Sequence, residues 1–419
     1  MDLTGVVGIW GYGIGGKALV DFLSEQSQQL MVFDKRSLLA DEILSLQQKN
    51  ILVADSLERF LSEADIIIPS AGVDLTSYQS VAYKFVSELD FFQAHFKKPI
   101  IAITGTLGKT TITTCLAELL KRAGKRVAIG GNIGIGLGSL IQQQELFDCA
   151  VLEVSSFQLE HIKSFAPSVA LWTNFYPNHL DRHPTITDYF NAKAMIARYQ
   201  DETALTIADR DIIEKIKSSS TFEHSWYELP LSMPEQWQKL VEKQSGLSDN
   251  WRILCSVIDA LKLPWEILNE PLSCMLEHRM EYVATINERI FYNDSKATVA
   301  QSTLAAVKQL EGKNIILLLN GLGKGVSREP LIKEIRSLVK QIVVCGAEAE
   351  QLELWSLANK VPVKRCSSFE ESVEMAYNCS IAGDVVLLSP AGSSFDLFKN
   401  YQERGKKFKE LVSELKGQK

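Results

Sequence analysis

The sequence has few features that would place the protein outside the globular class. Its seven cysteines have no CxxC spacing, so neither a zinc site nor a disulfide framework is predicted, and reduced thiols are expected. No apolar run is long enough to cross a bilayer, and the N-terminus lacks both a basic stretch and a signal-peptide cleavage pattern. We therefore expect a cytoplasmic protein with no membrane partner.

The chain also lacks an excess of positive charge. Its 51 acidic residues outnumber its 44 basic residues, which gives a formal net charge of −7. Nucleic-acid backbones select basic surfaces, so nucleic acid is not expected as a main partner. With 419 residues, of which 46% are hydrophobic, the chain is long enough for two or three ordinary domains.

The most informative segment begins with an apolar stretch, Ile100–Thr104. It continues into the glycine turn Gly105-Thr-Leu-Gly-Lys-Thr-Thr111, and a helical pattern follows. Strand, loop and helix in this order are typical of a phosphate loop, in which backbone N–H groups hold phosphates, the lysine reaches the outer phosphates and a hydroxyl binds Mg²⁺. Position 103 is Ile, where the longer form of the motif has its first glycine. The segment predicts binding of a nucleoside triphosphate.

Strand and helix patterns alternate along the whole chain, which predicts an α/β fold with parallel sheets. We expect three domains: a Rossmann-like N-terminal domain over 1–94, a central P-loop ATPase-type domain over 95–275, and a Rossmann-like C-terminal domain over 276–419. Residues 218–246 have weak periodicity and are expected to form a peripheral hairpin or loop.

A second glycine turn, Gly11-Tyr-Gly-Ile-Gly-Gly16, directly follows the first predicted strand. It fits the pattern G-x-G-x-x-G, and Asp34 closes the next strand, 18 residues after Gly16. The pattern alone leaves three interpretations open: NAD, another nucleotide-linked ligand, or close helix–strand packing without a ligand. The phosphate loop later in the chain favours a second nucleotide-linked ligand.

Candidate metal ligands follow the later strands of the central domain. Glu153 ends a strand 44 residues after Lys109, where its carboxylate suits Mg²⁺ at the carboxyl edge of the sheet. His179 lies in a polar loop and is expected to bind Mg²⁺ or phosphate, whereas Arg182 and His183 in the same loop could equally cap a helix or form salt bridges. Lys193, on the following helix, has the pattern of an ordinary surface lysine.

The C-terminal domain carries three polar loops at the ends of predicted strands. They cover residues 293–298, 320–324 and 388–396. Each alone could be a structural turn. Together with Arg279, Lys296 and Lys324 they favour a shared acidic ligand, because loops at strand ends hold anionic groups and the arginine offers a planar fork for phosphate.

These motifs together resemble the Mur ligase family of ATP-dependent amide ligases, over nearly the whole chain. The segments that carry the resemblance are Gly105–Thr111, Gly130–Gly134, Leu152–Glu160, His179–His183, Asn293–Thr298 and Leu388–Ala391. The short first domain and Ser155-Ser-Phe-Gln-Leu159 favour the branch that adds D-glutamate to UDP-N-acetylmuramoyl-L-alanine in peptidoglycan synthesis. The resemblance implies that ATP phosphorylates the substrate carboxylate. The amino group of D-glutamate then attacks through a tetrahedral intermediate and expels phosphate.

The resemblance also implies roles for individual residues in a monomer. ATP would be bound by Gly105, Thr106, Leu107, Gly108, Lys109, Thr110, Thr111, Arg279 and Asp294. The UDP-linked substrate would be bound by Gly13, Ile14, Asp34, Arg36, Gly72 and Asn132, and D-glutamate by Lys296, Thr298, Lys324, Ser394 and Tyr401. Two Mg²⁺ ions would be held by Thr110, Glu153, His179 and Lys193, the last as a carbamate formed with CO₂. The catalytic residues would be Lys109, Glu153, His179 and Lys193.

Several positions depart from the family pattern. Leu107 replaces a polar residue, Asn178 replaces an acidic residue before His179, and Leu322 replaces an acidic residue beside Lys324. The family's Gly-x-His-Asn stretch, expected near 246–250, lacks its His. Three alternatives remain: a related ligase for another amino acid or a folate tail, an NAD-dependent oxidoreductase, and a non-catalytic nucleotide-binding protein. The oxidoreductase would leave the phosphate loop unexplained.

Overall fold

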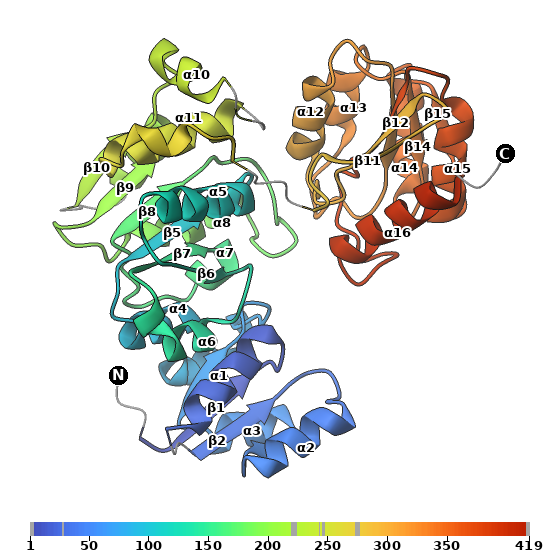
Figure 1. Ribbon diagram of the computed structural model, residues 1–419. Helices are drawn as coiled ribbons and strands as arrows, with labels where there is room; N and C mark the ends of the chain where they lie inside the picture. Colours follow the sequence, from blue (N-terminus) through green and yellow to red (C-terminus); the bar gives the residue numbers. More distant parts are fainter. Residues whose placement is uncertain are drawn as a thin grey trace. The chain divides into compact units, whose positions relative to one another are not determined.

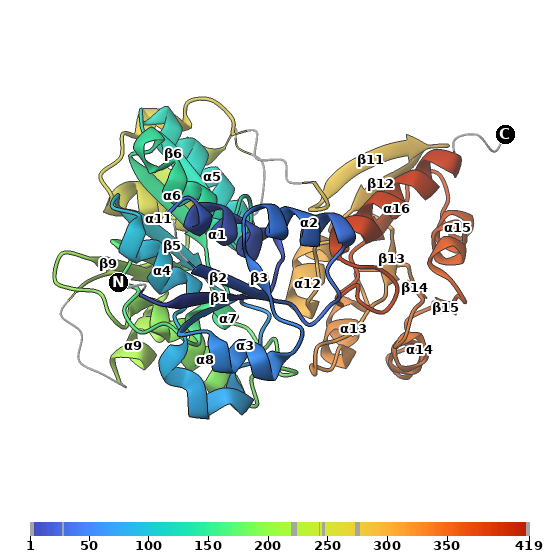
Figure 2. The same cartoon turned by 90° about the horizontal axis from the view of Figure 1, so that it is seen from below.

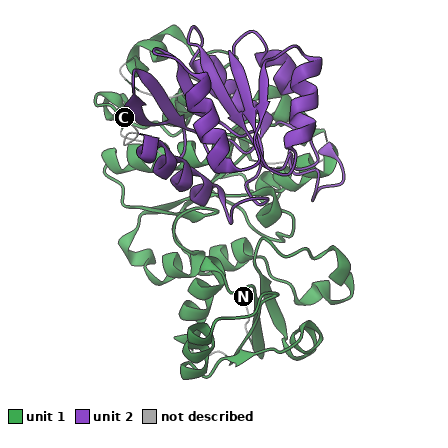
Figure 3. Cartoon of the chain, turned by 90° about the vertical axis from the view of Figure 1, so that its right-hand side faces the viewer, with its two compact units in different colours: residues 1–175, 187–272 green, residues 176–186, 273–419 purple. Residues whose placement is uncertain are grey.

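The computed structural model describes residues 4–26, 29–218, 224–242, 244, 248–272 and 277–415. The chain divides into two compact units (Figure 3). Unit 1 comprises residues 1–175 and 187–272, and unit 2 comprises residues 176–186 and 273–419. Nothing in this division tests the predicted boundaries near 94 and 275, which stay predictions.

The N-terminal part of unit 1, blue in Figure 1, is a parallel sheet with the strand order β3-β2-β1-β4. Its strands are β1 (Val6–Trp10), β2 (Gln29–Phe33), β3 (Leu52–Val53) and β4 (Ile66–Pro69). The helices are α1 (Ile14–Ser24), α2 (Ala40–Gln48), α3 (Leu57–Glu63), the 3₁₀ helix η1 (Thr76–Lys84) and α4 (Glu88–His95).

Helices cover both faces of this sheet (Figure 2). Successive side chains of a strand point to opposite faces. Accordingly, Ile9 of β1 packs in one core with Leu19 of α1, whereas Trp10 packs in another core with Phe60 of α3. Burial on both faces explains the nearly continuous apolar sequence of β1.

The central part of unit 1 is a second parallel sheet, with the order β10-β9-β8-β5-β7-β6. Its strands are β5 (Ile100–Thr104), β6 (Val127–Gly131), β7 (Cys149–Glu153), β8 (Val169–Trp172), β9 (Leu205–Ala208) and β10 (Ser225–Glu228). The α-helices are α5 (Lys109–Arg122), α6 (Leu137–Gln142), α7 (Ser156–Leu159), α8 (Ile186–Ala194), α9 (Arg210–Lys217), α10 (Glu235–Val241) and α11 (Ser248–Ala260). Short 3₁₀ helices are η2 (Gln144–Leu146), η3 (Met195–Ala197) and η4 (Trp265–Leu268).

One continuous core joins the two sheets of unit 1. Residues of β1 and α1 belong to the same hydrophobic cluster as residues of β5, β7 and α6. Helices α1 and α6 pack closely against each other. A Cβ atom built on Gly138 of α6 would lie only 2.2 Å from the carbonyl oxygen of Ala18 in α1. This packing fixes the glycine turn before α1 relative to the central sheet.

Unit 2 contains the third sheet, with the order β11-β12-β16-β13-β14-β15. Its strands are β11 (Glu281–Ile286), β12 (Arg289–Asn293), β13 (Ile315–Leu319), β14 (Gln341–Val344), β15 (Val363–Arg365) and β16 (Val385–Leu388). The pair β11–β12 is antiparallel and the other pairs are parallel. The helices are α12 (Ala300–Gln309), α13 (Glu329–Ile335), α14 (Ala349–Ala358), α15 (Phe369–Cys379) and α16 (Tyr401–Leu415).

The α/β fold with parallel sheets is confirmed, and one local prediction is wrong. Strand β10 pairs in parallel with β9, so residues 225–228 form an edge strand, and α10 follows at Glu235–Val241, where we expected a hairpin or loop. Residues 219–223, 243 and 245–247 of that segment lie outside the described residues. Within the described ranges, no helix combines the length and the apolar character that crossing a bilayer requires.

Candidate functional site

The predicted phosphate loop joins β5 to α5. Its two glycines have backbone angles that favour glycine, φ +138° at Gly105 and φ +79° at Gly108, the N-cap of α5. A Cβ atom on Gly105 would lie 2.0 Å from Oγ1 of Thr173. The loop therefore needs glycine at position 105 both for its conformation and for its close contact with the end of β8.

Side chains from the end of β8 hold this loop, and the sequence analysis missed them. Asn174 Oδ1 accepts the N–H of Leu107 at 2.8 Å, and Thr173 Oγ1 donates to the Leu107 carbonyl at 2.6 Å. Lys109 Nζ donates to the carbonyl oxygens of Gly105 and Thr106 at 2.9 and 3.0 Å. The lysine thus spans the loop from the first turn of α5, and its contact with the outer phosphates stays a prediction.

Glu153 reaches the phosphate loop from the end of β7. Its Oε2 accepts the hydroxyl proton of Thr110 at 2.6 Å, and its Oε1 accepts a hydrogen bond from Asn132 Nδ2 at 3.0 Å. Glu153 is 3% exposed. A hydroxyl and a carboxylate beside a phosphate loop are the hard oxygen donors that Mg²⁺ prefers. Among the residues that the structure describes, no group of three or more His, Cys, Asp and Glu could hold a metal by itself.

Lys193 is buried, so its interpretation as an ordinary surface lysine is wrong. It is 2% exposed, and its Nζ lies 3.4 Å from Thr104 Oγ1 and 4.8 Å from the ring centre of Tyr189. Burial lowers the pKa of Lys193 well below its usual range. The positive charge of Lys109 acts in the same direction, and Glu153 opposes it. The periodicity of α8 could not reveal that this face turns toward β5.

The first glycine turn forms a second polar site in unit 1. Asp34 Oδ2 accepts the N–H of Tyr12 at 2.7 Å, and Oδ1 accepts the N–H of Arg36 at 3.0 Å. The Arg36 guanidinium binds both oxygens of Glu42, at 2.7 and 2.9 Å, and the Tyr12 carbonyl at 3.1 Å. Lys17 also contacts Glu42, at 2.8 Å. Glu42 and Lys17 were not predicted, because contacts between α1 and α2 leave no local sequence signal.

The surroundings of this turn leave room for a ligand. Ile14 is 74% exposed at the start of α1. A Cβ atom on Gly13 or on Gly72 would meet no heavy atom within 4 Å. The side chains of Arg36 and Lys17 hold the pKa of Glu42 well below its usual range, so this carboxyl is charged and neutralised by two cations.

In unit 2, Asp294 lies at the end of β12 and is buried. Its Oδ2 accepts a hydrogen bond from the Ser389 hydroxyl at 2.7 Å, and its Oδ1 accepts the N–H of Met280 at 3.3 Å. Burial raises the pKa of Asp294 to about 6, although the positive charge of Arg279 opposes this shift. Arg279 and Asp294 therefore lie close enough within unit 2 to interact electrostatically, and their contact with ATP stays a prediction.

The predicted D-glutamate residues also form pairs within unit 2. Lys296 Nζ lies 5.4 Å from the ring centre of Tyr401, and Lys324 Nζ lies 3.3 Å from Thr298 Oγ1. Ser394 is buried, and its carbonyl accepts the N–H groups of the residues that lead toward α16. The structure thus gathers loops that are up to about a hundred residues apart in the chain.

Arg404 of α16 connects these loops and was missed in the sequence. It is fully buried, and its guanidinium donates to Ser295 Oγ and O at 3.0 and 2.8 Å, to Asn320 Oδ1 at 2.9 Å and to the Gly392 carbonyl at 3.1 Å. Each of the three polar loops therefore contributes an acceptor to one side chain. Burial lowers the pKa of Arg404 to about 10.

His179 belongs to unit 2, in the segment 176–186. It has φ +56°, its N–H donates to Asn178 Oδ1 at 2.9 Å, and its carbonyl accepts the N–H groups of Arg182 and His183. This residue therefore forms a tight turn. The prediction that His179 binds Mg²⁺ together with Glu153 and Lys193 involves residues of both units, and it stays a prediction.

The segment near 246–250, which lacks the family's His, is described only in part. Its Asn250 lies against the phosphate loop in unit 1, 3.0 Å from a Cβ built on Gly108. Residues 245–247 lie outside the described ranges.

The fold and the loop define a class: an α/β protein with a phosphate loop, a buried carboxylate beside it and a second glycine turn. Comparison with known protein families identifies which family of this class the chain matches. Residues 103–248 match the Mur ligase middle domain, and residues 278–392 match the Mur ligase glutamate ligase domain.

Similar curated proteins include UDP-N-acetylmuramoylalanine–D-glutamate ligases of Desulfotalea psychrophila and Clostridium tetani. The first is 33% identical and covers 99% of this chain and 97% of its own length. The second is 34% identical and covers 98% and 96%. The chain therefore belongs to the Mur ligase family.

Solved structures share the fold. The MurF ligase from Thermotoga maritima, solved with ADP, has a TM-score of 0.60 at 16% identity and covers 99% of this chain and 95% of its own. The UDP-N-acetylmuramate–alanine ligase MurC of the same organism has a TM-score of 0.58 at 15% identity, covering 99% and 100%.

Proposed function

We propose that the protein ligates D-glutamate to UDP-N-acetylmuramoyl-L-alanine, with hydrolysis of ATP to ADP and phosphate, in peptidoglycan synthesis. The single observation that carries the proposal is the Thr110–Glu153 pair beside the loop Gly105–Thr111. The names of relatives that match almost the full chain supply the substrate class. The oxidoreductase alternative would leave the phosphate loop and the Thr110–Glu153 pair unexplained.

Unit 1 would bind the triphosphate. The N–H groups at the start of α5 and the ammonium of Lys109 would neutralise the phosphates, because phosphoryl transfer depends on positioning and charge stabilisation more than on covalent help. Thr110 and Glu153 fit Mg²⁺, since both present oxygen atoms next to the loop. When bound, the ion would offset negative charge on the phosphates; His179 would contribute to a second ion.

Lys193 would be carbamylated. The amine must be neutral to attack CO₂, and the burial that lowers the pKa of Lys193 favours that neutral form. Attack forms a bond from Nζ to carbon and releases one proton, which leaves a carbamate whose two oxygens share one negative charge. The change replaces a buried amine with an anionic oxygen ligand suited to Mg²⁺.

The remaining predicted residues divide between the two substrates. The glycine turn with Gly13, Ile14, Asp34 and Arg36, together with Gly72 and Asn132, would hold the UDP-linked substrate. In unit 2, Arg279 and Asp294 would contact ATP. The pairs Lys296–Tyr401 and Lys324–Thr298, with Ser394, would hold the carboxylates of D-glutamate.

We also infer a monomer in the cytoplasm. The described cysteines are unpaired, which suits a reducing compartment. Gel filtration at micromolar concentration tests the monomer.

A phosphate-release assay tests the function. Release is expected only when ATP, Mg²⁺, UDP-N-acetylmuramoyl-L-alanine and D-glutamate are all present, and it should stop when either substrate is left out. Parallel reactions with L-glutamate, L-lysine and glycine test the choice of amino acid. Phosphate release that does not depend on D-glutamate would reject the assigned acceptor.

A further inference from the structure

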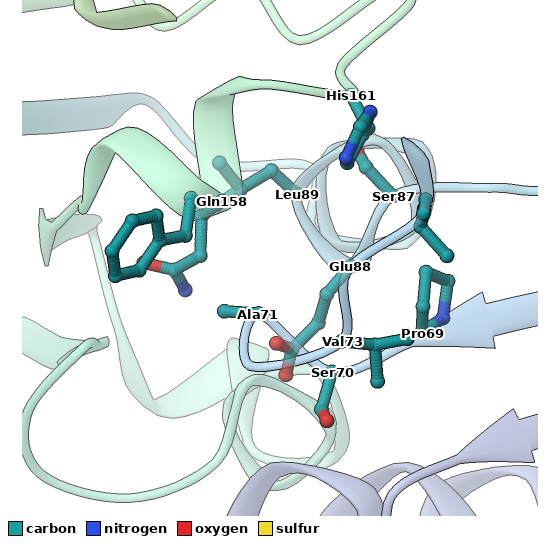
Figure 4. A pocket seen from close by; sticks show the side chains of 11 residues that line it. Pro69, Ser70, Ala71, Val73, Ser87, Glu88, Leu89, Gln158 and His161 are labelled. Carbon is teal, nitrogen blue, oxygen red and sulfur yellow. The ribbon is translucent and has the colours of Figure 1, made fainter. Parts of the chain in front are cut away.

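Unit 1 contains a small pocket between the loop after β4, the first turn of α4 and helix α7 (Figure 4). The polar residues that line it include Ser70, Glu88, Gln158 and His161. The pocket borders the glycine turn at the start of α1, since a Cβ atom on Gly15 would lie 3.0 Å from Oε1 of Glu88. It therefore belongs to the surroundings of that turn. A different arrangement, in unit 2, is built around Arg328.

Arg328 lies at the start of α13 and is buried, with 1% of its surface exposed. Its Nη1 donates to the Asn320 carbonyl at 2.9 Å and to the Pro390 carbonyl at 3.4 Å. Its Nη2 donates to the Gly321 carbonyl at 2.9 Å and forms an ion pair with Oε2 of Glu348 at 2.6 Å. One guanidinium group therefore binds the backbone of the two polar loops that follow β13 and β16.

Glu348 binds the loop after β13 from the start of α14. Its Oε1 accepts the N–H of Gly323 at 3.0 Å, while its Oε2 binds Arg328. A Cβ atom on Gly323 would lie 3.4 Å from Glu348 Oε2 and 3.6 Å from Arg328 Nε, so the loop packs directly on the ion pair. Leu322 exchanges two backbone hydrogen bonds with Ser393, at 2.9 and 2.8 Å. Each of residues 320 to 323 therefore has a backbone hydrogen bond to a residue outside the loop.

Lys324 follows this anchored stretch and has an unusual backbone conformation. Its φ is +54°, in the left-handed region, and Gly325 continues with φ +74°. A lysine adopts this region at a cost in free energy, so the surrounding contacts must hold it there. In this conformation Lys324 Nζ lies 3.3 Å from Thr298 Oγ1 on another polar loop. The anchored stretch therefore determines where the ammonium group of Lys324 lies.

Arg328 brings no local advantage to its own helix. It is the N-cap of α13, a position where a short polar side chain usually accepts an N–H of the first turn, and its side chain accepts no such bond. A positive charge at a helix N-terminus is also unfavourable. A buried arginine–glutamate pair, moreover, often contributes no more stability than apolar residues of the same volume. Residues that break local rules in this way are expected where function requires a fixed arrangement.

We propose that Arg328 and Glu348 are positioning residues for the incoming amino acid. The pair fixes the backbone of residues 320–323 and thereby directs Lys324 toward a carboxylate of D-glutamate, without contact between the pair and the substrate. This role rests on the proposed function, because it assumes that Lys324 binds D-glutamate. Loss of the pair should therefore raise the KM for D-glutamate and leave the KM for ATP and for the UDP-linked substrate unchanged.

Phosphate-release kinetics, with each of the three substrates varied in turn, test the proposal. Arg328→Leu should raise the KM for D-glutamate about tenfold, because the loop carbonyls lose their donors and a small displacement of Lys324 weakens binding. The KM values for the other two substrates should change less than about twofold. Arg328→Lys should raise the KM for D-glutamate by a smaller factor, because an ammonium keeps the charge without the planar fork. Glu348→Gln keeps an acceptor for Gly323 but loses the ion pair, and its KM for D-glutamate should rise about threefold.

Lys340→Met is the matched control. Lys340 forms an ion pair with the buried carboxylate of Asp384, also at 2.6 Å, and both residues precede strands of the same sheet, at the edge opposite to the polar loops. Arg328→Leu and Lys340→Met should both lower the urea concentration at the midpoint of unfolding. Only Arg328→Leu should change the KM for D-glutamate. A merely structural role of Arg328 would instead give the two variants the same pattern of KM values.

An unchanged KM for D-glutamate in Arg328→Leu, an equal rise in all three KM values, or the same rise in Lys340→Met would overturn the positioning role. If Arg328→Leu does not unfold cooperatively, Arg328→Lys and Glu348→Gln decide the question by the same comparison. These outcomes leave the D-glutamate-dependent release of phosphate by the wild-type protein intact. Wild-type release that ignores D-glutamate would overturn the proposed function, and the positioning role with it.

Discussion

The hydroxyl of Thr110 donates a 2.6 Å hydrogen bond to Oε2 of Glu153, across 43 positions of the chain. The pair joins the first turn of α5 to the end of β7 and lies in unit 1. Parallel strands bring such ends to one edge of a sheet, next to the start of the helix that follows β5. The pair therefore creates an oxygen-lined site beside the phosphate loop.

Replacing Glu153 tests this site. Glu153→Gln should raise the Mg²⁺ concentration for half-maximal activity about 10- to 100-fold, because the carboxylate charge is lost while the hydrogen bond to Thr110 is kept. The measurement is a Mg²⁺ titration of phosphate release. Glu118→Gln, an exposed substitution on α5, should leave the titration unchanged. An unchanged Mg²⁺ requirement in Glu153→Gln would remove Glu153 from the metal site.

Lys109 should be needed for turnover. Lys109→Ala removes the ammonium that spans the loop between Gly105 and Thr106, and we expect turnover to fall by at least about a hundredfold. The measurement is steady-state phosphate release at saturating ATP. Lys121→Ala, in the last turn of the same helix, is the matched control and should remain near wild type. Near-normal turnover of Lys109→Ala would reject the phosphate-loop assignment.

Lys193 should make stability depend on pH in CO₂-free buffer. Its folded-state pKa is below the unfolded value, so the unfolded state binds more protons between the two values. The free energy of unfolding should therefore rise with pH in that window, by up to about 1.4 kcal/mol per pH unit for one proton. Below the folded-state pKa both states carry the proton, and this contribution to the slope vanishes.

The measurement for Lys193 is urea unfolding at pH 7, 8 and 9. Lys193→Met should flatten the pH dependence relative to wild type, because the apolar side chain fits a buried site without a charge. Lys125→Met, on the exposed turn after α5, serves as the control and should keep the wild-type slope. If Lys193→Met and wild type have the same slope, Lys193 is not the desolvated amine that carbamylation requires.

Arg404 should stabilise unit 2 by holding its three polar loops together. Arg404→Leu leaves buried acceptors on Ser295, Asn320 and Gly392 unpaired, and we expect a loss of at least about 2 kcal/mol in the free energy of unfolding. Arg404→Lys should recover only part of that loss, because an ammonium cannot reproduce the planar fork.

Urea unfolding measures the stability loss of the Arg404 variants, and the KM for D-glutamate should rise together with it. Lys406→Met, an exposed substitution on the same helix, should change neither quantity. Wild-type stability in Arg404→Leu would show that the three loops hold their arrangement without this side chain.

The sequence predicted those parts of the site that are local in the chain. The phosphate loop is one continuous strand, turn and helix, so its residues Gly105–Thr111 could be named from their order alone. Glu153 could be named because it ends a strongly apolar strand. The parallel-sheet prediction placed the end of that strand at the same edge of the sheet as the end of β5, where the phosphate loop begins.

Contacts between elements that are distant in the chain could not be predicted. Thr173 and Asn174 bind Leu107 only because β8 pairs with β5, and that pairing is not visible in either segment. Lys193 was interpreted as a surface residue because the helical pattern of its segment does not show that the side of the helix with the lysine is buried. Strand β10 was missed because it is a short edge strand without buried residues and with little alternation.

The most direct test of the central claim follows oxygen from the substrate carboxylate. UDP-N-acetylmuramoyl-L-alanine labelled with ¹⁸O at both carboxylate oxygens is turned over with ATP and D-glutamate, and the released phosphate is analysed by mass spectrometry. Activation of the carboxylate by ATP predicts one ¹⁸O atom in each phosphate and one left in the new amide. Unlabelled phosphate would mean that water, and not the substrate carboxylate, attacks ATP, and it would contradict the account.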